Sequence, residues 1–144
     1  MATRITLVNT EEHDPRFNMP YTPAIKVLSG RPVYLAGVTA APVYHSHPHV
    51  AQEFGGIPGD PAEQARMCIQ NLERVLESAG GRLSDVVDMT RYIVDVERNQ
   101  DAINRVLGQR LGDHRPATTT VEVVRLATDP RLLLEIHAVA YVAE

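Results

Sequence analysis

The chain has 144 residues, of which 44% are hydrophobic and 22% charged, and its net charge at pH 7 is −4. This length and composition are typical of one globular domain, covering residues 1–144, that can bury a core of its own. The acidic balance, without any basic run, argues against a nucleic-acid-binding protein, because such binding depends on Lys and Arg contacts to phosphates.

Cysteine content and hydropathy narrow the class further. The only cysteine, Cys68, excludes an internal disulfide. No apolar run approaches membrane-spanning length, and no basic-then-apolar signal segment opens the chain. We therefore expect no membrane partner and a cytoplasmic location.

The N-terminal part of the chain predicts three short strands, at Thr3–Val8, Ala24–Leu28 and Pro32–Val38. The first alternates apolar and polar residues, and the other two are short apolar runs. The Ser29-Gly30-Arg31 segment between the second and third strands predicts a hairpin turn. The polar segment Asn9–Thr22 is expected to form a surface loop.

The long segment Thr39–Gly59 has no regular periodicity and contains the sequence HSHPH, with His45, His47 and His49. Imidazoles at alternate positions of a strand share a face and could ligate Zn or Fe. Pro48 argues against a regular strand, however, and no acidic motif accompanies the histidines. We therefore favour a polar loop, which could line a pocket, over a metal site.

Two helices are predicted, at Asp60–Ala79 and Glu97–Leu111, with a strand at Val86–Val96 between them. Asp60 is a suitable N-cap, and Glu63 follows it at the spacing of a capping box. Apolar residues recur on one face of each helix, so each helix should pack one side against a sheet.

The C-terminal part predicts two strands, Ala117–Leu126 and Leu132–Val142, separated by a turn. The whole order, β-β-β-α-β-α-β-β, predicts an α+β fold with a six-stranded mixed sheet and both helices on one face. The other face of this sheet would be partly apolar and uncovered. Packing against further copies of the chain is a natural way to cover it.

Glu135 is the main candidate for acid–base chemistry, because it lies within the apolar run Leu132–Ile136. Partial burial favours the neutral, proton-donating form of a carboxyl group. The alternative is that Glu135 forms a structural ion pair with Arg125 or another arginine. A third possibility is ligand binding without catalysis, with Tyr21, Asn104 and Thr118 placing hydrogen bonds in an apolar cleft.

Several segments, in this order along the chain, resemble the RidA/YjgF/UK114 family. They are Pro20-Tyr21, VYLAG at Val33–Gly37, GGRLSDVVDMTRYIVDV at Gly80–Val96, AIN at Ala102–Asn104, PATTTVEVVRL at Pro116–Leu126 and LEIHAVA at Leu134–Ala140. The resemblance implies a chorismate-mutase-like subunit in a homotrimer with a barrel-like core, and ligand clefts between subunits. It implies hydrolysis of small enamines or imines without a metal or organic cofactor, although some members are described as ribonucleases.

The resemblance also implies roles for individual residues. Tyr21 and Asn104 match ligand-binding positions of the family, and Glu135 matches the glutamate that orients or activates the hydrolytic water. Thr118 stands where the deaminases carry an arginine that binds the substrate carboxylate, and Ala36 stands where the family has a cleft serine. Losing a hydrogen bond to a charged group costs about 1.5–3 kcal/mol, so small amino-acid-derived enamines should be poor substrates.

The sequence leaves the replacement for the missing arginine open among three residues, Arg91, His47 and Arg115. The expected function is hydrolytic deamination of an enamine or imine, with Glu135 as the catalytic residue. Its expected ligand contacts come from Tyr21, Ala36, Arg91, Asn104 and Thr118. The alternative is a non-catalytic, metabolite-binding trimer, and a ribonuclease is the least favoured reading because of the acidic charge.

Overall fold

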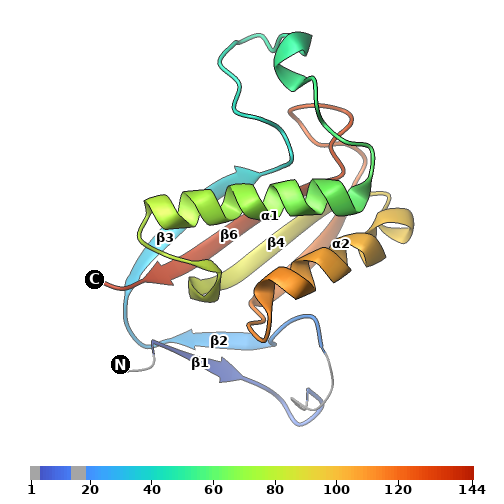
Figure 1. Ribbon diagram of the computed structural model, residues 1–144. Coiled ribbons are helices and arrows are strands. Elements are labelled where there is room, and N and C mark those ends of the chain that lie inside the picture. The colour runs from blue at the N-terminus through green and yellow to red at the C-terminus, as the bar shows by residue number, and fades with distance from the viewer. Residues whose placement is uncertain (1–3, 14–18) are drawn as a thin grey trace.

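The computed structural model describes residues 4–13 and 19–144 of the chain (Figure 1). The elements, in order, are β1 (Ile5–Val8), β2 (Ala24–Val27), β3 (Arg31–Val38), η1 (Ala51–Phe54), α1 (Pro61–Ser78), η2 (Leu83–Asp85), β4 (Val86–Val94), α2 (Val96–Leu111), β5 (Ala117–Val123) and β6 (Leu134–Val142). Both helices lie on one face of the main sheet, as predicted (Figure 1).

The predicted six-stranded sheet is wrong, because the strands form two sheets. The main sheet has the order β3-β6-β4-β5, in which only β4 and β5 are parallel. Strands β1 and β2 form a separate antiparallel pair. The predicted hairpin around Gly30 is also wrong, because β3 pairs with β6 near the C-terminus of the chain, with Arg31 opposite Val142, and not with β2.

The turn at Gly30 connects two strands that belong to different sheets. Gly30 has a φ of +107°, and a Cβ atom added there would lie 2.7 Å from the Val142 carbonyl oxygen. Only glycine adopts this conformation at low cost, and only glycine leaves room for β6 at this point. The glycine therefore directs the chain from β2 into the main sheet instead of closing a β2–β3 hairpin.

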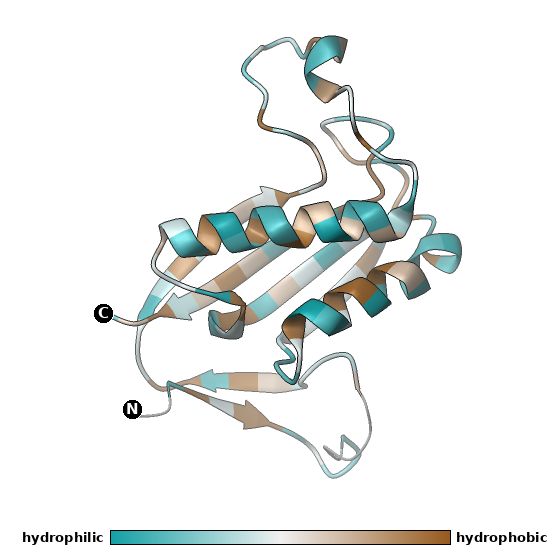
Figure 2. Ribbon diagram, viewed as in Figure 1, coloured by the Kyte–Doolittle hydropathy of each residue, from teal (hydrophilic) through white to brown (hydrophobic). Residues whose placement is uncertain are grey.

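Strand β6 is central in the main sheet, and its burial alternates strictly along its length. Leu134, Ile136 and Ala138 are fully buried toward the helices, whereas Glu135 and His137 are half-buried on the other face. This period of two is the signature of a strand with one face on the core. Figure 2 shows apolar residues recurring along the strands and along both helices above them.

Helix α1 begins at Pro61, and the Asp60 carboxylate accepts a hydrogen bond from the backbone N–H of Glu63 at 3.0 Å. This confirms the predicted N-cap. Helix α2 begins at Val96, one residue before the predicted start, and is capped by Asp95. The apolar faces of the two helices and the sheet form one core, which includes Ile69, Leu72, Met89, Ile103, Leu107, Leu134 and Ile136.

The segment between β3 and α1 is irregular except for η1, as predicted, and it extends beyond the end of the sheet (Figure 1). Phe54 and Ile57 of this segment join Leu126 and Leu132 in a second, smaller core. Among the described residues, no helix combines the length and apolar character needed to cross a membrane.

Candidate functional site

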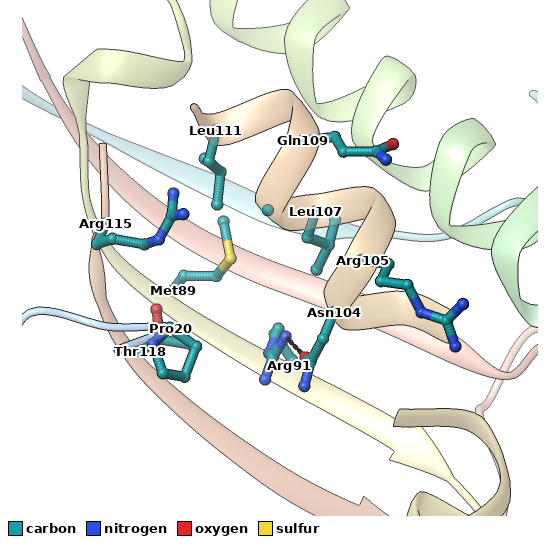
Figure 3. Close-up of a pocket in the computed structure, with 11 residues that line it drawn as sticks. Pro20, Met89, Arg91, Asn104, Arg105, Leu107, Gln109, Leu111, Arg115 and Thr118 are labelled. Atoms are coloured by element: carbon teal, nitrogen blue, oxygen red, sulfur yellow. Dashed lines mark hydrogen bonds between the residues drawn. The ribbon is translucent and has the colours of Figure 1, made fainter. Parts of the chain in front are cut away.

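A cavity of about 430 Å³ lies between α2 and the strands β4 and β5 (Figure 3). Three residues of the sequence-predicted site, Arg91, Asn104 and Thr118, line it. The rest of the lining consists of Pro20, Met89, Arg105, Leu107, Gly108, Gln109, Leu111 and Arg115. This volume suits a small metabolite.

Arg91 is held in a fixed position at the wall of this cavity. Its Nε and Nη2 donate to Thr120 Oγ1 at 3.0 and 2.6 Å. Its Nη1 donates to Asn104 Oδ1 at 2.6 Å, the contact drawn in Figure 3. The side chain reaches these partners because Arg91 and Thr120 are paired on adjacent parallel strands. Arg91 is only 8% exposed, and burial lowers the pKa of its guanidinium from the ordinary value.

The hydroxyl of Thr118 donates to the carbonyl of Pro116 at 3.0 Å. Its proton is therefore directed to the chain's own backbone, and the oxygen can only accept a hydrogen bond from a ligand. Thr118 lines the cavity, but in this arrangement it does not supply a donor to an anion.

Tyr21 lies next to the cavity wall rather than in it, since its neighbour Pro20 is the lining residue. The Tyr21 hydroxyl is 3.1 Å from His13 Nε2, and His13 Nδ1 is 2.7 Å from Thr10 Oγ1. Thr22 anchors this segment to the start of β5, because its backbone N–H donates to the carbonyl of Pro116.

Glu135 lies beside a bulge in β3. Leu35 pairs with Ala138 and Val38 with Ile136, so Ala36 and Gly37 both stand opposite His137. The Glu135 carboxylate lies across Gly37, where an added Cβ would be only 2.1 Å from Oε1. The bulge and its glycine therefore make room for this carboxylate.

The structure shows no ion pair or side-chain hydrogen bond for Glu135 among residues 4–13 and 19–144. The Nε of Arg125, the partner considered from the sequence, donates instead to the carbonyl of Leu126. Glu135 is thus a half-buried carboxylate that remains available to a ligand.

The predicted site residues lie on two faces of the sheet. Arg91 pairs with Ile136, which faces the helices, whereas Glu135 pairs with Tyr92 on the opposite face. Cross-strand partners share a face, and neighbouring residues of a strand face opposite ways. Within one copy of the chain, Glu135 and Ala36 are therefore separated by the sheet from Arg91 and Asn104.

Two of the three histidines of the irregular segment, His47 and His49, belong to an aromatic cluster. The rings of His47 and His49 lie 5.4 and 4.6 Å from Tyr44, and His49 is also 5.3 Å from Phe54. The backbone of His45 donates to the Glu53 carboxylate at 2.5 Å. In the described part of the chain, no three His, Cys, Asp or Glu side chains are grouped so as to hold a metal ion.

Cys68 is a core residue, in agreement with its place in the apolar stripe of α1. It is fully buried, and its thiol donates to the carbonyl of Val38 at 3.2 Å. Burial raises the pKa of the thiol well above its ordinary value, so the reactive thiolate is suppressed.

Sequence reasoning did not single out the apolar cavity walls or the role of Gly37. Two local signals point to the walls: Met89 precedes Arg91 by two positions on β4, and Leu107 and Leu111 follow Asn104 by three and seven positions on α2. These spacings place each set on one face. Gly37 has no comparable signal, because its contact with Glu135 depends on the pairing of β3 with β6.

Comparison with known proteins agrees with this architecture. A family model described as Endoribonuclease L-PSP matches residues 11–142. A RutC family protein from Pyrococcus abyssi is 36% identical over 131 residues, which cover 90% of this chain and 92% of that protein. A 2-iminobutanoate/2-iminopropanoate deaminase from Escherichia coli is 32% identical over 93 residues, which cover 62% of this chain and 72% of the deaminase.

A solved structure of a Rid family protein also matches this chain. A Rid family protein of unknown function from Yersinia pestis matches with a TM-score of 0.76 and 29% identity, covering 97% of this chain and 100% of that one. The ordered motifs, the α+β fold and these relatives agree, and the chain belongs to the RidA/YjgF/UK114 family, whose model is described as Endoribonuclease L-PSP.

Proposed function

We propose that this protein hydrolyses an enamine or imine in a cleft formed between copies of a homotrimer. Membership of the family and the similarity to a named iminoacid deaminase support this class of reaction. The observation that carries the proposal is Glu135, a half-buried carboxylate that lies over the Gly37 backbone without a polar partner among the described residues.

Glu135 supplies the proton transfers in this proposal. In its neutral form it protonates the carbon of the enamine C=C bond, which gives an iminium ion. Water then adds to the iminium carbon, and the Glu135 carboxylate accepts the proton of that water. Transfer of the hydroxyl proton of this adduct to its nitrogen and breaking of the C–N bond release ammonia and leave a carbonyl product, so the net reaction consumes one water for each ammonia released.

The separation of the site residues supports a cleft between copies. Arg91, Asn104 and Thr118 border the cavity on the helix side of the sheet, and Glu135 lies on the other side. A single small substrate cannot contact both groups within one copy. In a closed ring, the Glu135 face of one copy can meet the cavity edge of the next, and each cleft then contains both groups.

The test is ammonia release from a panel of reactive imines, made in the assay from their amino-acid precursors, together with imines that lack a carboxylate. Glu135→Gln should lower turnover by about 10²–10⁴-fold, the usual contribution of a general acid–base. Glu122→Gln is the matched control, because the Glu122 carboxylate accepts a structural hydrogen bond from Val96 N–H at 2.9 Å. Unchanged turnover in Glu135→Gln would refute the mechanism.

The second candidate is a metabolite-binding trimer without catalysis. Thr118 stands at the position of the family's carboxylate-binding arginine, and its hydroxyl donates to the backbone carbonyl of Pro116 instead of to a ligand. The loss of the family's substrate contact at this position favours the alternative. Saturable binding of a small metabolite without ammonia release from any imine of the panel would support this alternative. RNA cleavage that Glu135→Gln abolishes would instead support a ribonuclease.

A further inference from the structure

The guanidinium of Arg91 is a buried cation without an acidic partner. Among residues 4–13 and 19–144, no carboxylate forms an ion pair with it, and the cavity lining contains neither Asp nor Glu. Its two side-chain partners, Thr120 and Asn104, are uncharged. Buried charges are normally paired, because an uncompensated charge is costly in an apolar environment.

Arg91 retains hydrogen-bonding capacity for a ligand. An arginine has five N–H donors, and three are used by Thr120 and Asn104, so 5 − 3 = 2 remain. The same contacts restrict rotation of the guanidinium, which reduces the entropy that a bound ligand would otherwise cost. Asn104 adds its amide N–H groups, because only its Oδ1 is engaged.

Part of the remaining cavity wall is apolar. Met89, Leu107 and Leu111 lie on the side of the cavity next to Arg115, whereas Arg105 and Gln109 extend outward from α2 (Figure 3). Arg115 Nη1 donates to the carbonyls of Gly112 and His114, so this second cation is tied to backbone. The buried guanidinium of Arg91 beside this apolar wall fits a ligand with one anionic end and a hydrocarbon chain.

We propose that Arg91, from β4, binds the carboxylate of a small organic acid whose apolar chain packs on Met89, Leu107 and Leu111. The paired oxygens of a carboxylate match the fork of a guanidinium. This inference rests on the proposed function, because it takes the cavity of one copy to form the reaction site together with Glu135 of the next copy. It names Arg91 as the residue that takes over carboxylate binding from the family's missing arginine, and it reverses the expectation, drawn from Thr118, that the substrate lacks a carboxylate.

The test measures binding separately from turnover. Affinities of the protein for 4-methylpentanoate, 4-methylpentanamide and inorganic phosphate are measured by calorimetry. The acid and the amide have the same shape and differ in charge, so the carboxylate should bind roughly 10- to 100-fold more tightly than the amide. Equal binding of acid and amide, a preference for phosphate, or no binding of the acid overturns the proposal.

Variants then locate the site. Arg91→Met should weaken 4-methylpentanoate binding by roughly 10- to 100-fold. Arg98→Gln, an exposed arginine on the same helix as Asn104, should leave it unchanged. Arg91→Lys keeps the charge but not the fork, and should bind more weakly than the native protein. Unchanged acid binding in a folded Arg91→Met variant overturns the proposal.

The outcomes separate this inference from the proposed reaction. Acid binding that depends on Arg91, without ammonia release from any imine, supports the anion site and refutes the hydrolase. Ammonia release that depends on Glu135 but not on Arg91 supports the hydrolase and refutes the anion site. Thermal unfolding of each variant confirms that it is folded, and Leu107→Ala, at the apolar wall, should reduce affinity for 4-methylpentanoate more than for acetate.

Discussion

Two inactive variants should restore activity when they assemble together, if each cleft takes residues from two copies. Glu135→Gln removes the carboxylate on one face of the sheet, and Arg91→Met removes the guanidinium on the other. Each variant alone should form trimers with little turnover. A mixed trimer contains some clefts in which the intact Glu135 comes from one copy and the intact Arg91 from the next.

The size of the recovery follows from the geometry. In an equal, random mixture, a cleft receives an intact Glu135 with a probability of one half and an intact Arg91 with the same probability. Roughly a quarter of all clefts are therefore native in both residues, and in trimers that contain both variants the share rises to roughly a third, since one of the three clefts in such a ring is native. If both residues acted within one copy, every copy would lack one of them, and mixing would restore no cleft.

Co-expression of the two variants with different affinity tags provides the assay. Sequential purification on both tags isolates mixed trimers, and ammonia release is compared with the native protein and with each variant alone. Because loss of a general acid–base lowers turnover by about 10²–10⁴-fold, recovery to tens of per cent is readily distinguished from the variants' own activity. Mixed trimers as inactive as the separate variants would refute the cleft between copies.

Three further predictions follow from local geometry. Gly37→Ala should place a methyl group against the Glu135 carboxylate and lower turnover on the order of 100-fold, with little change in Tm. Gly59→Ala is the control and should have no effect, because a Cβ atom added at Gly59 meets no atom within 4 Å. Native protein should not react with Ellman's reagent at pH 8, because burial raises the pKa of the Cys68 thiol, and it should react fully once unfolded; rapid reaction of folded protein would contradict this. Asp60→Ala should lower the free energy of unfolding by about 1 kcal/mol through loss of the α1 cap, as measured by urea denaturation, and Asp60→Asn should retain most of it.

Local pattern was sufficient for the elements whose stability comes from nearby residues. The start of α1 follows from Asp60 and Pro61, and β6 follows from its alternation of apolar and polar residues. These features depend on interactions within a few positions of the chain, which a sequence displays directly. The same local character allowed the family to be identified from short, ordered motifs.

Pairing between distant segments could not be read in this way. The separation of β1–β2 from the main sheet and the pairing of β3 with β6 depend on which strands meet after collapse. These pairings place Gly37 beneath Glu135 and set Arg91 against Thr120. They also place Glu135 and Arg91 on opposite faces, although the sequence suggested one site.

The sequence by itself determined the residue types available for chemistry, a carboxylate in an apolar strand and a threonine in place of the family's arginine. Only the tertiary structure decided that Arg91, and not His47, lies in the cavity with Asn104. The physical reason is that side-chain chemistry is a property of each residue. Burial, orientation and access to a partner are properties of the surrounding strands and helices, which the chain brings together only on folding.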